Sequence, residues 1–196
     1  MSIIDKAQLL GFRNQSRTFS KGLSGSLNEF INESRIGKVT IFLSHKHNER
    51  TELDAAIQFL KRMNVNVYVD WLDDEMPAHT SGVTASRIKN KIKENRKFIF
   101  LATEGAINSK WCNWELGIGD THKYIKHIAL MPVKENHKDY SGSEYLQIYP
   151  TIEFVRRLTI QRQIGGYFEE GYYVVSPIEV GTSRSYTKLE DWLIIN

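Results

Sequence analysis

The sequence predicts an α/β protein in which a parallel sheet is covered by helices on both faces. Short runs of β-forming apolar residues alternate with amphipathic helical patterns from residue 39 to residue 133. The runs are apolar at successive positions, which is typical of strands buried on both faces. Because such sheets bind ligands outside the carboxyl ends of their strands, a functional site is expected in residues 44–48, 70–82 and 103–115.

The alternation fixes the expected order of elements. Strands are predicted at 39–43, 65–69, 97–102 and 128–133. Between them, apolar side chains recur every three or four residues, as on one face of a helix. These helices are predicted at 48–63, 83–95 and 111–123. Residues 70–82 and 103–110 are polar and are predicted as loops, and the first is long for such a connection.

The pattern weakens at both ends of the chain. Residues 134–171 show no clear period, after which a strand is predicted at 172–175 and a helix at 188–195. Near the start, Ser26 and Glu29 have the spacing of a capping box, and a short helix to about residue 35 is predicted. We therefore expect an N-terminal helical extension over residues 1–38 and one domain over residues 39–196.

Composition excludes several classes of function. The chain has 196 residues, with 26 basic and 23 acidic side chains, and the excess of three comes from residues 1–38. This excess is too small to indicate nucleic-acid binding. The sequence contains no run of 18 apolar residues, so no membrane-spanning helix is predicted. The single cysteine, Cys112, excludes an internal disulfide and a cysteine-based zinc site, so a cytoplasmic protein is expected.

Several catalytic motifs are missing or incomplete. Neither a Walker sequence nor GxGxxG follows any predicted strand. His45 and His47 form a His-x-His pair, but further ligands are not evident, so solvated loop histidines are favoured and no metal is expected. Ser44 and His45 are adjacent and should point in opposite directions, which is unsuitable for a nucleophile–base pair. Cys112 has no obvious partner and is expected to be a packed residue.

The most informative segment is Asn108–Gly117. Its Trp111 and Glu115 are four residues apart, and therefore lie one turn apart on one helix face. An aromatic side chain can hold a carboxylate partly desolvated, so that it stabilises an oxocarbenium-like centre or binds a sugar hydroxyl. A glutamate near a helix N-terminus is also simply favourable to the helix dipole, and the spacing leaves both readings open.

The order of these segments resembles a Toll/interleukin receptor (TIR) domain. The resemblance rests on 39–44, Val69-Asp70-Trp71, 98–103 and above all Ser109-Lys110-Trp111-Cys112-Asn113-Trp114-Glu115-Leu116. It implies a flavodoxin-like fold and cleavage of the nicotinamide–ribose bond of NAD, giving ADP-ribose or a cyclic ADP-ribose-type product. NAD would be a substrate, with no separate cofactor.

The resemblance also implies roles for residues and partners. Glu115 would be catalytic, with Trp111 behind it, while Ser44, His45 and the loop from Trp71 to Ser81 would surround the substrate. Self-association is expected, as is an effector protein activated by the product in antiphage defence of the Thoeris type. Three alternatives stay open: a non-catalytic interaction module, a nucleoside-cleaving transferase of related build, and a virulence factor acting on host signalling.

Overall fold

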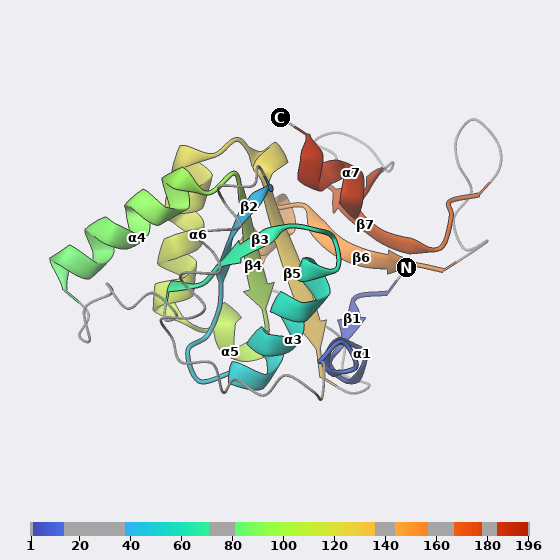
Figure 1. Ribbon diagram of the computed structural model, residues 1–196, viewed down its shortest axis with the longest axis horizontal. Helices are drawn as coiled ribbons and strands as arrows, with labels where there is room; N and C mark the ends of the chain where they lie inside the picture. Colours follow the sequence, from blue (N-terminus) through green and yellow to red (C-terminus); the bar gives the residue numbers. More distant parts are fainter. Residues whose placement is uncertain are drawn as a thin grey trace.

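The predicted α/β architecture is confirmed by the computed structural model, which describes residues 2–13, 38–70, 81–135, 144–156, 167–177 and 184–195. A mostly parallel sheet runs through the molecule with helices on both sides (Figure 1). Its parallel strands are β2 (Thr40–Ser44), β3 (Asn66–Tyr68), β4 (Lys97–Ala102), β5 (Ile128–Lys134) and β6 (Thr151–Val155). They follow the order β3-β2-β4-β5-β6, which is the flavodoxin-like order.

This strand order determines where a ligand can bind. The chain passes from β2 outward to β3, then crosses back over β2 to place β4 on its other side. The connections before and after this reversal leave the sheet in opposite directions, and a crevice forms between them at the carboxyl ends of the strands. The carboxyl end of β2, where Ser44 lies, is therefore the favoured position for a site.

Alternate side chains of each central strand enter different cores. Ile41 and Leu43 of β2 face one core, whereas Phe42 between them faces the other. The first core is covered by α1 (Lys6–Leu10), α3 (Arg50–Lys61) and α7 (Leu189–Ile194). The second is covered by α4 (Gly82–Glu94), α5 (Glu104–Ile107) and α6 (Lys110–His122). Burial on both faces explains why these strands are apolar at every position.

The predicted strands and long helices agree with the structure to within about two residues. The segment 103–110 was expected to be a loop but contains α5, because the Thr103 side chain caps it by accepting from the Ala106 amide. The C-terminal half adds β6 and the antiparallel strands β7 (Gly171–Ser176) and β8 (Ser185–Lys188). Short 3-10 helices occupy Ile125–His127 and Glu144–Ile148. The helix expected up to residue 35 lies outside the described residues.

The beginning of the chain is part of the core, which corrects the expected extension over residues 1–38. Strand β1 (Ile4–Asp5) pairs in parallel with the end of β5, and Ser2 forms a bridge to Phe154 of β6. Ile4 and Leu9 are fully buried. Composition could not show this, because a strand of two residues has no periodicity. Residues 2–13 therefore belong structurally to the domain that was expected to begin at residue 39.

We predict that Leu9→Ala lowers the free energy of unfolding by ~2–5 kcal/mol, because it leaves a cavity under α1. Its exposed neighbour Gln8, which donates to the Tyr172 hydroxyl, provides the control. Gln8→Ala should change stability by no more than ~0.5 kcal/mol. Urea denaturation followed by circular dichroism measures both, and equal values for the two variants would show that α1 does not belong to the folded core.

Candidate functional site

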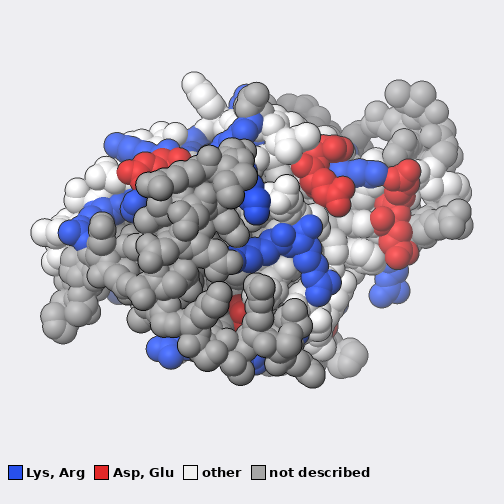
Figure 2. All heavy atoms as spheres, viewed as in Figure 1, with Lys and Arg blue, Asp and Glu red and all other residues white. Residues whose placement is uncertain are grey.

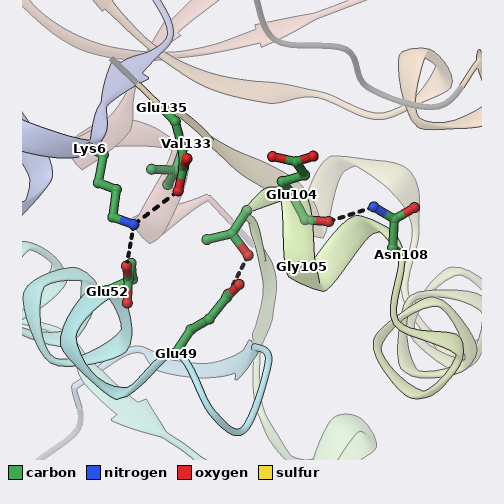
Figure 3. A pocket seen from close by; sticks show the side chains of 9 residues that line it. Lys6, Glu49, Glu52, Glu104, Gly105, Asn108, Val133 and Glu135 are labelled. Carbon is green, nitrogen blue, oxygen red and sulfur yellow. Dashed lines mark hydrogen bonds and ion pairs between the residues drawn. The ribbon is translucent and has the colours of Figure 1, made fainter. Parts of the chain in front are cut away.

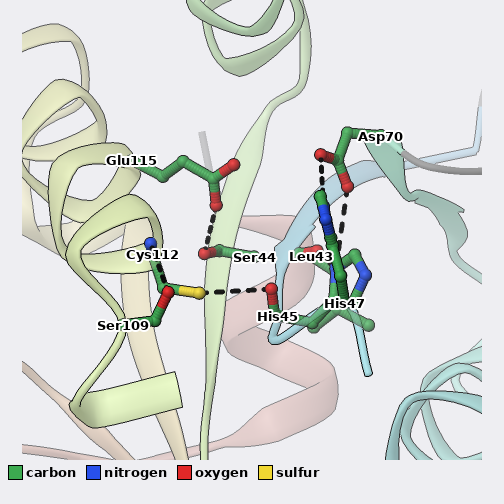
Figure 4. A network of polar contacts seen from close by, with 8 residues as sticks. All are labelled: Leu43, Ser44, His45, His47, Asp70, Ser109, Cys112 and Glu115. Atoms are coloured by element: carbon green, nitrogen blue, oxygen red, sulfur yellow. Dashed lines mark hydrogen bonds and ion pairs between the residues drawn. The ribbon is translucent and has the colours of Figure 1, made fainter. Parts of the chain in front are cut away.

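Polar side chains gather at the carboxyl ends of β2 and β3, facing the first half of α6 (Figure 4). As expected from the sequence, Ser44 and Glu115 come together here. The Ser44 hydroxyl donates to the Glu115 carboxyl, with 2.5 Å between Oγ and Oε2. Asp70 follows β3 and approaches the same place from the other side. The three side chains come from three elements, so only the folded sheet brings them together.

The position of Glu115 is fixed by how α6 begins and how closely it approaches the sheet. The Ser109 side chain caps the helix by accepting from the Cys112 amide, at 3.4 Å. One turn after Glu115, Gly119 lies against the ring of Phe98 in β4, and a Cβ atom there would come within 3.1 Å of that ring. The missing side chain lets the helix lie close to the sheet, and Glu115 is only 2% exposed.

Burial makes Glu115 difficult to ionise. Removal from water and the negative charge of Asp70 raise the pKa of this carboxyl well above its usual value near 4.5. Hydrogen bonds from Ser44 and Trp111 favour the charged form and oppose this shift. Ser44 and Trp111 thus offer hydrogen bonds to a carboxylate whose ionisation is unfavourable because of burial and of Asp70. A nearby positive charge would make this ionisation more favourable.

Asp70 connects this carboxyl to the two histidines of the first loop. His47 Nε2 lies 3.2 Å from Asp70 Oδ2, and His45 Nδ1 lies 3.8 Å from Asp70 Oδ1. Asp70 was not among the sequence-predicted site residues. Asp70 directly follows the predicted strand 65–69, which lies beside the strand that ends at residue 43. Because the carboxyl ends of neighbouring parallel strands meet at one edge of the sheet, this position could have indicated Asp70 from the sequence.

The histidines differ in environment and in charge. His47 is exposed, and its bond to Asp70 raises its pKa. His45 is only 3% exposed, and burial lowers its pKa. Its Nδ1 lies 3.2 Å from the Leu43 carbonyl, while its Nε2 is buried without a hydrogen-bond partner. The expectation of solvated loop histidines therefore fails for His45, because α6 covers the loop through the contact of Cys112 Sγ with the His45 carbonyl, at 3.2 Å.

The remaining predicted residues have different surroundings. Trp111 is partly buried, donates to Glu115 and stacks on Trp114 with ring centroids 4.8 Å apart. Ser81 caps α4 in a reciprocal capping box with Thr84. Trp71 lies outside the described residues. Cys112 is packed as expected, and burial raises the pKa of its thiol to about 11, which makes it a poor nucleophile.

A separate cavity of about 280 Å³ opens on the same edge of the sheet, beyond β4 (Figure 3). Its polar lining is mainly acidic and includes Glu49, Glu52, Glu104 and Glu135. Lys6, brought in by α1, pairs with Glu52 and Glu135 at 2.8 and 3.0 Å. A surplus of carboxylates is unfavourable for a phosphate-bearing ligand, so this cavity does not suit a dinucleotide.

The surface agrees with the nearly balanced composition. On the face shown in Figure 2, basic side chains lie near the middle and on the left, while acidic ones lie at the upper left and in a larger group on the right. Among the described residues drawn there, neither sign of charge covers the face, whereas a basic stripe is the usual mark of a nucleic-acid surface. Within the described residues, every helix is too short or too polar to span a membrane.

Fold and site together define a class of protein. The chain belongs to the TIR domain family, which it matches over residues 41–161, more than half of its 196 residues. The matched region runs from β2 past β6 and contains Ser44, Asp70 and Glu115.

Two relatives make the comparison more specific. The chain is 27% identical over 157 residues to the probable 3' cyclic ADP-D-ribose synthase ThsB' of Bacillus cereus (strain MSX-D12), covering 78% of this chain and 74% of that protein. It is 23% identical over 79 residues to the putative cyclic ADP-D-ribose synthase TIR2 of Cytobacillus dafuensis. The second match spans 39% of this chain and 21% of that longer protein.

The buried carboxyl should make stability depend on pH. Because folding raises the pKa of Glu115, the folded state retains a proton that the unfolded chain releases. Stability is then lost as pH rises from about 4.5 to the folded pKa, by ~1.4 kcal/mol per unit of difference. We predict that Glu115→Gln is stabilised relative to the wild type, with a gain that grows over this range and then levels off.

Urea denaturation between pH 4 and 9 measures this gain. Glu94→Gln on the exposed side of α4 provides the matched control, because that side chain is 61% exposed. The control should give a small difference with no such rise. A gain for Glu115→Gln that is the same at every pH would show that the carboxyl is not held protonated by the fold.

Proposed function

We propose that the protein is an enzyme that cleaves the nicotinamide–ribose bond of NAD and releases a cyclic ADP-ribose-type signalling product. Membership of the TIR family and the similarity to two proteins named as cyclic ADP-D-ribose synthases support this proposal. The observation that carries it is the Glu115 carboxyl, buried at the end of β2 and held by Ser44 and Trp111. NAD is a substrate in this proposal, and no separate cofactor takes part.

The charge of the substrate fits the acidic pair. The nicotinamide of NAD is a pyridinium cation, and its approach to Glu115 and Asp70 opposes the burial and the repulsion that raise the pKa of Glu115. The cation thereby favours the ionised form of Glu115, which faces the nicotinamide ribose. Hydrogen bonds from Ser44 and Trp111 hold the carboxylate in a fixed direction, so little reorganisation is needed during the reaction.

Bond cleavage moves the positive charge toward this carboxylate. The C–N bond breaks with both electrons going to nicotinamide, which leaves as a neutral molecule. The anomeric carbon becomes oxocarbenium-like, and the Glu115 carboxylate stabilises it electrostatically. A hydroxyl of the ADP-ribosyl group captures this carbon and loses its proton to give a cyclic product. Capture by water gives ADP-ribose instead.

Other parts of the site complete the proposal. His45 and Ser81 contact the substrate, and Trp71 stacks on one of its rings. The product activates a separate effector protein in antiphage defence of the Thoeris type, and the reaction takes place in the cytoplasm. Subunits associate through the region around residues 70–82, beside which the apolar side chain of Val83 is 59% exposed.

Glu115→Gln tests the mechanism because it removes the charge at nearly constant volume. We predict a loss of NAD cleavage of at least ~100-fold, measured as nicotinamide release by chromatography with mass detection of the second product. Glu94→Gln should retain wild-type turnover. Wild-type turnover by Glu115→Gln would exclude the mechanism, and no turnover by the wild-type protein under any assembly state would favour an interaction module.

Self-association is tested by dilution. We predict that the specific activity rises with protein concentration in parallel with the oligomer fraction measured by light scattering. Val83→Lys should shift both curves to higher concentration, because it places a charge on the proposed contact. A flat activity profile from a fully active monomer would contradict the proposal.

A further inference from the structure

We propose that His45, His47 and Asp70 form a binding site for a divalent transition-metal ion, of which zinc is the natural probe. One ligand atom from each residue lies within 4.8 Å of the other two. The sequence showed only the His-x-His pair, and the fold supplies the third ligand from the end of β3. The sequence led us to expect no metal, and we now propose one because Asp70 supplies the third ligand.

The ligand chemistry suits such an ion. Two imidazoles and one carboxylate, with a further position left open, are a common ligand set for zinc and neighbouring metals. The backbone leaving β2 places both rings on one side, with centroids 5.5 Å apart. His47 is exposed at the mouth of the group, whereas His45 and Asp70 are buried, so an ion could enter from solvent.

The hydrogen bonding of His45 leaves one of its ring nitrogens without a partner. Its Nδ1 faces the Leu43 carbonyl at 3.2 Å and can only donate there, because a carbonyl is an acceptor. The lone pair is then left on Nε2, which is buried and has no hydrogen-bond partner. Nδ1 is also the nitrogen that lies 3.8 Å from Asp70 Oδ1, so an ion shared with Asp70 would bind His45 through Nδ1, with the ring proton moved from Nδ1 to Nε2.

An ion at this position would inhibit NAD cleavage, a consequence that rests on the proposed function. It would neutralise Asp70, whose charge acts directly on Glu115. It would also place a positive charge where the cationic nicotinamide ring is proposed to bind. The metal and the substrate would therefore compete for the same acidic group.

Metal binding can be measured without NAD. Protein freed of metal with a chelator and then exchanged into chelator-free buffer is titrated with zinc chloride by calorimetry, and with cobalt(II) by visible absorption. We expect saturable binding of one ion, and an affinity at least ~10-fold weaker in His47→Asn. His122→Asn, an exposed histidine on the last turn of α6, should match the wild type. Absence of saturable binding, or equal affinity of His47→Asn and the wild type, would overturn the site.

The inhibitory role has its own readout. One equivalent of zinc should slow NAD cleavage by the wild type and by His122→Asn, and the chelator should restore it. His47→Asn should keep its turnover at the same zinc concentration. Equal inhibition of His47→Asn would overturn the inhibitory role, as would bound zinc that leaves turnover unchanged. Failure of NAD cleavage in every sample would instead contradict the proposed function and leave the binding result intact.

Discussion

The buried carboxyl of Glu115 is the constraint on which the site depends. Taking an ionisable group out of water beside another acid is unfavourable, and the surrounding structure limits rather than removes this cost. Ser44 and Trp111 donate to the carboxyl, and the absence of a side chain at Gly119 lets α6 hold it close to the sheet. A group held in this way is poised to respond to positive charge.

The sheet supplies the rigidity that this arrangement requires. Its central strands are buried on both faces, and the flavodoxin-like order separates the helices that leave β2 and β4. The chain start adds to this frame, because β1 pairs with β5 while Ser2 bridges to β6. Side chains at the carboxyl edge therefore stand on a platform of closely packed strands.

The sequence predicted the central strands because burial on both faces leaves continuous apolar runs. The four-residue spacing placed Trp111 and Glu115 on one helix face but left a catalytic and a structural role open, and only the resemblance to the TIR family pointed to Glu115 as catalytic. The sequence could not predict β1, which is too short to carry a pattern. It also could not predict the burial of His45, since this depends on how closely α6 packs over the first loop. The sequence also did not single out Asp70 as a site residue, because the side chains that surround it come from segments that only the fold brings together.

Asp70 and Glu115 can be relieved of their mutual repulsion in several ways, and each produces a different state of the protein. A proton on Glu115 is one of them, and the raised pKa of this carboxyl favours it. In the proposed reaction, a pyridinium ring favours ionisation and bond cleavage follows, after which neutral nicotinamide no longer compensates the negative charge. A metal ion held by Asp70 and the histidines satisfies the same requirement without a bond to break. The acidity that favours a cationic leaving group thus also makes the site sensitive to other cations.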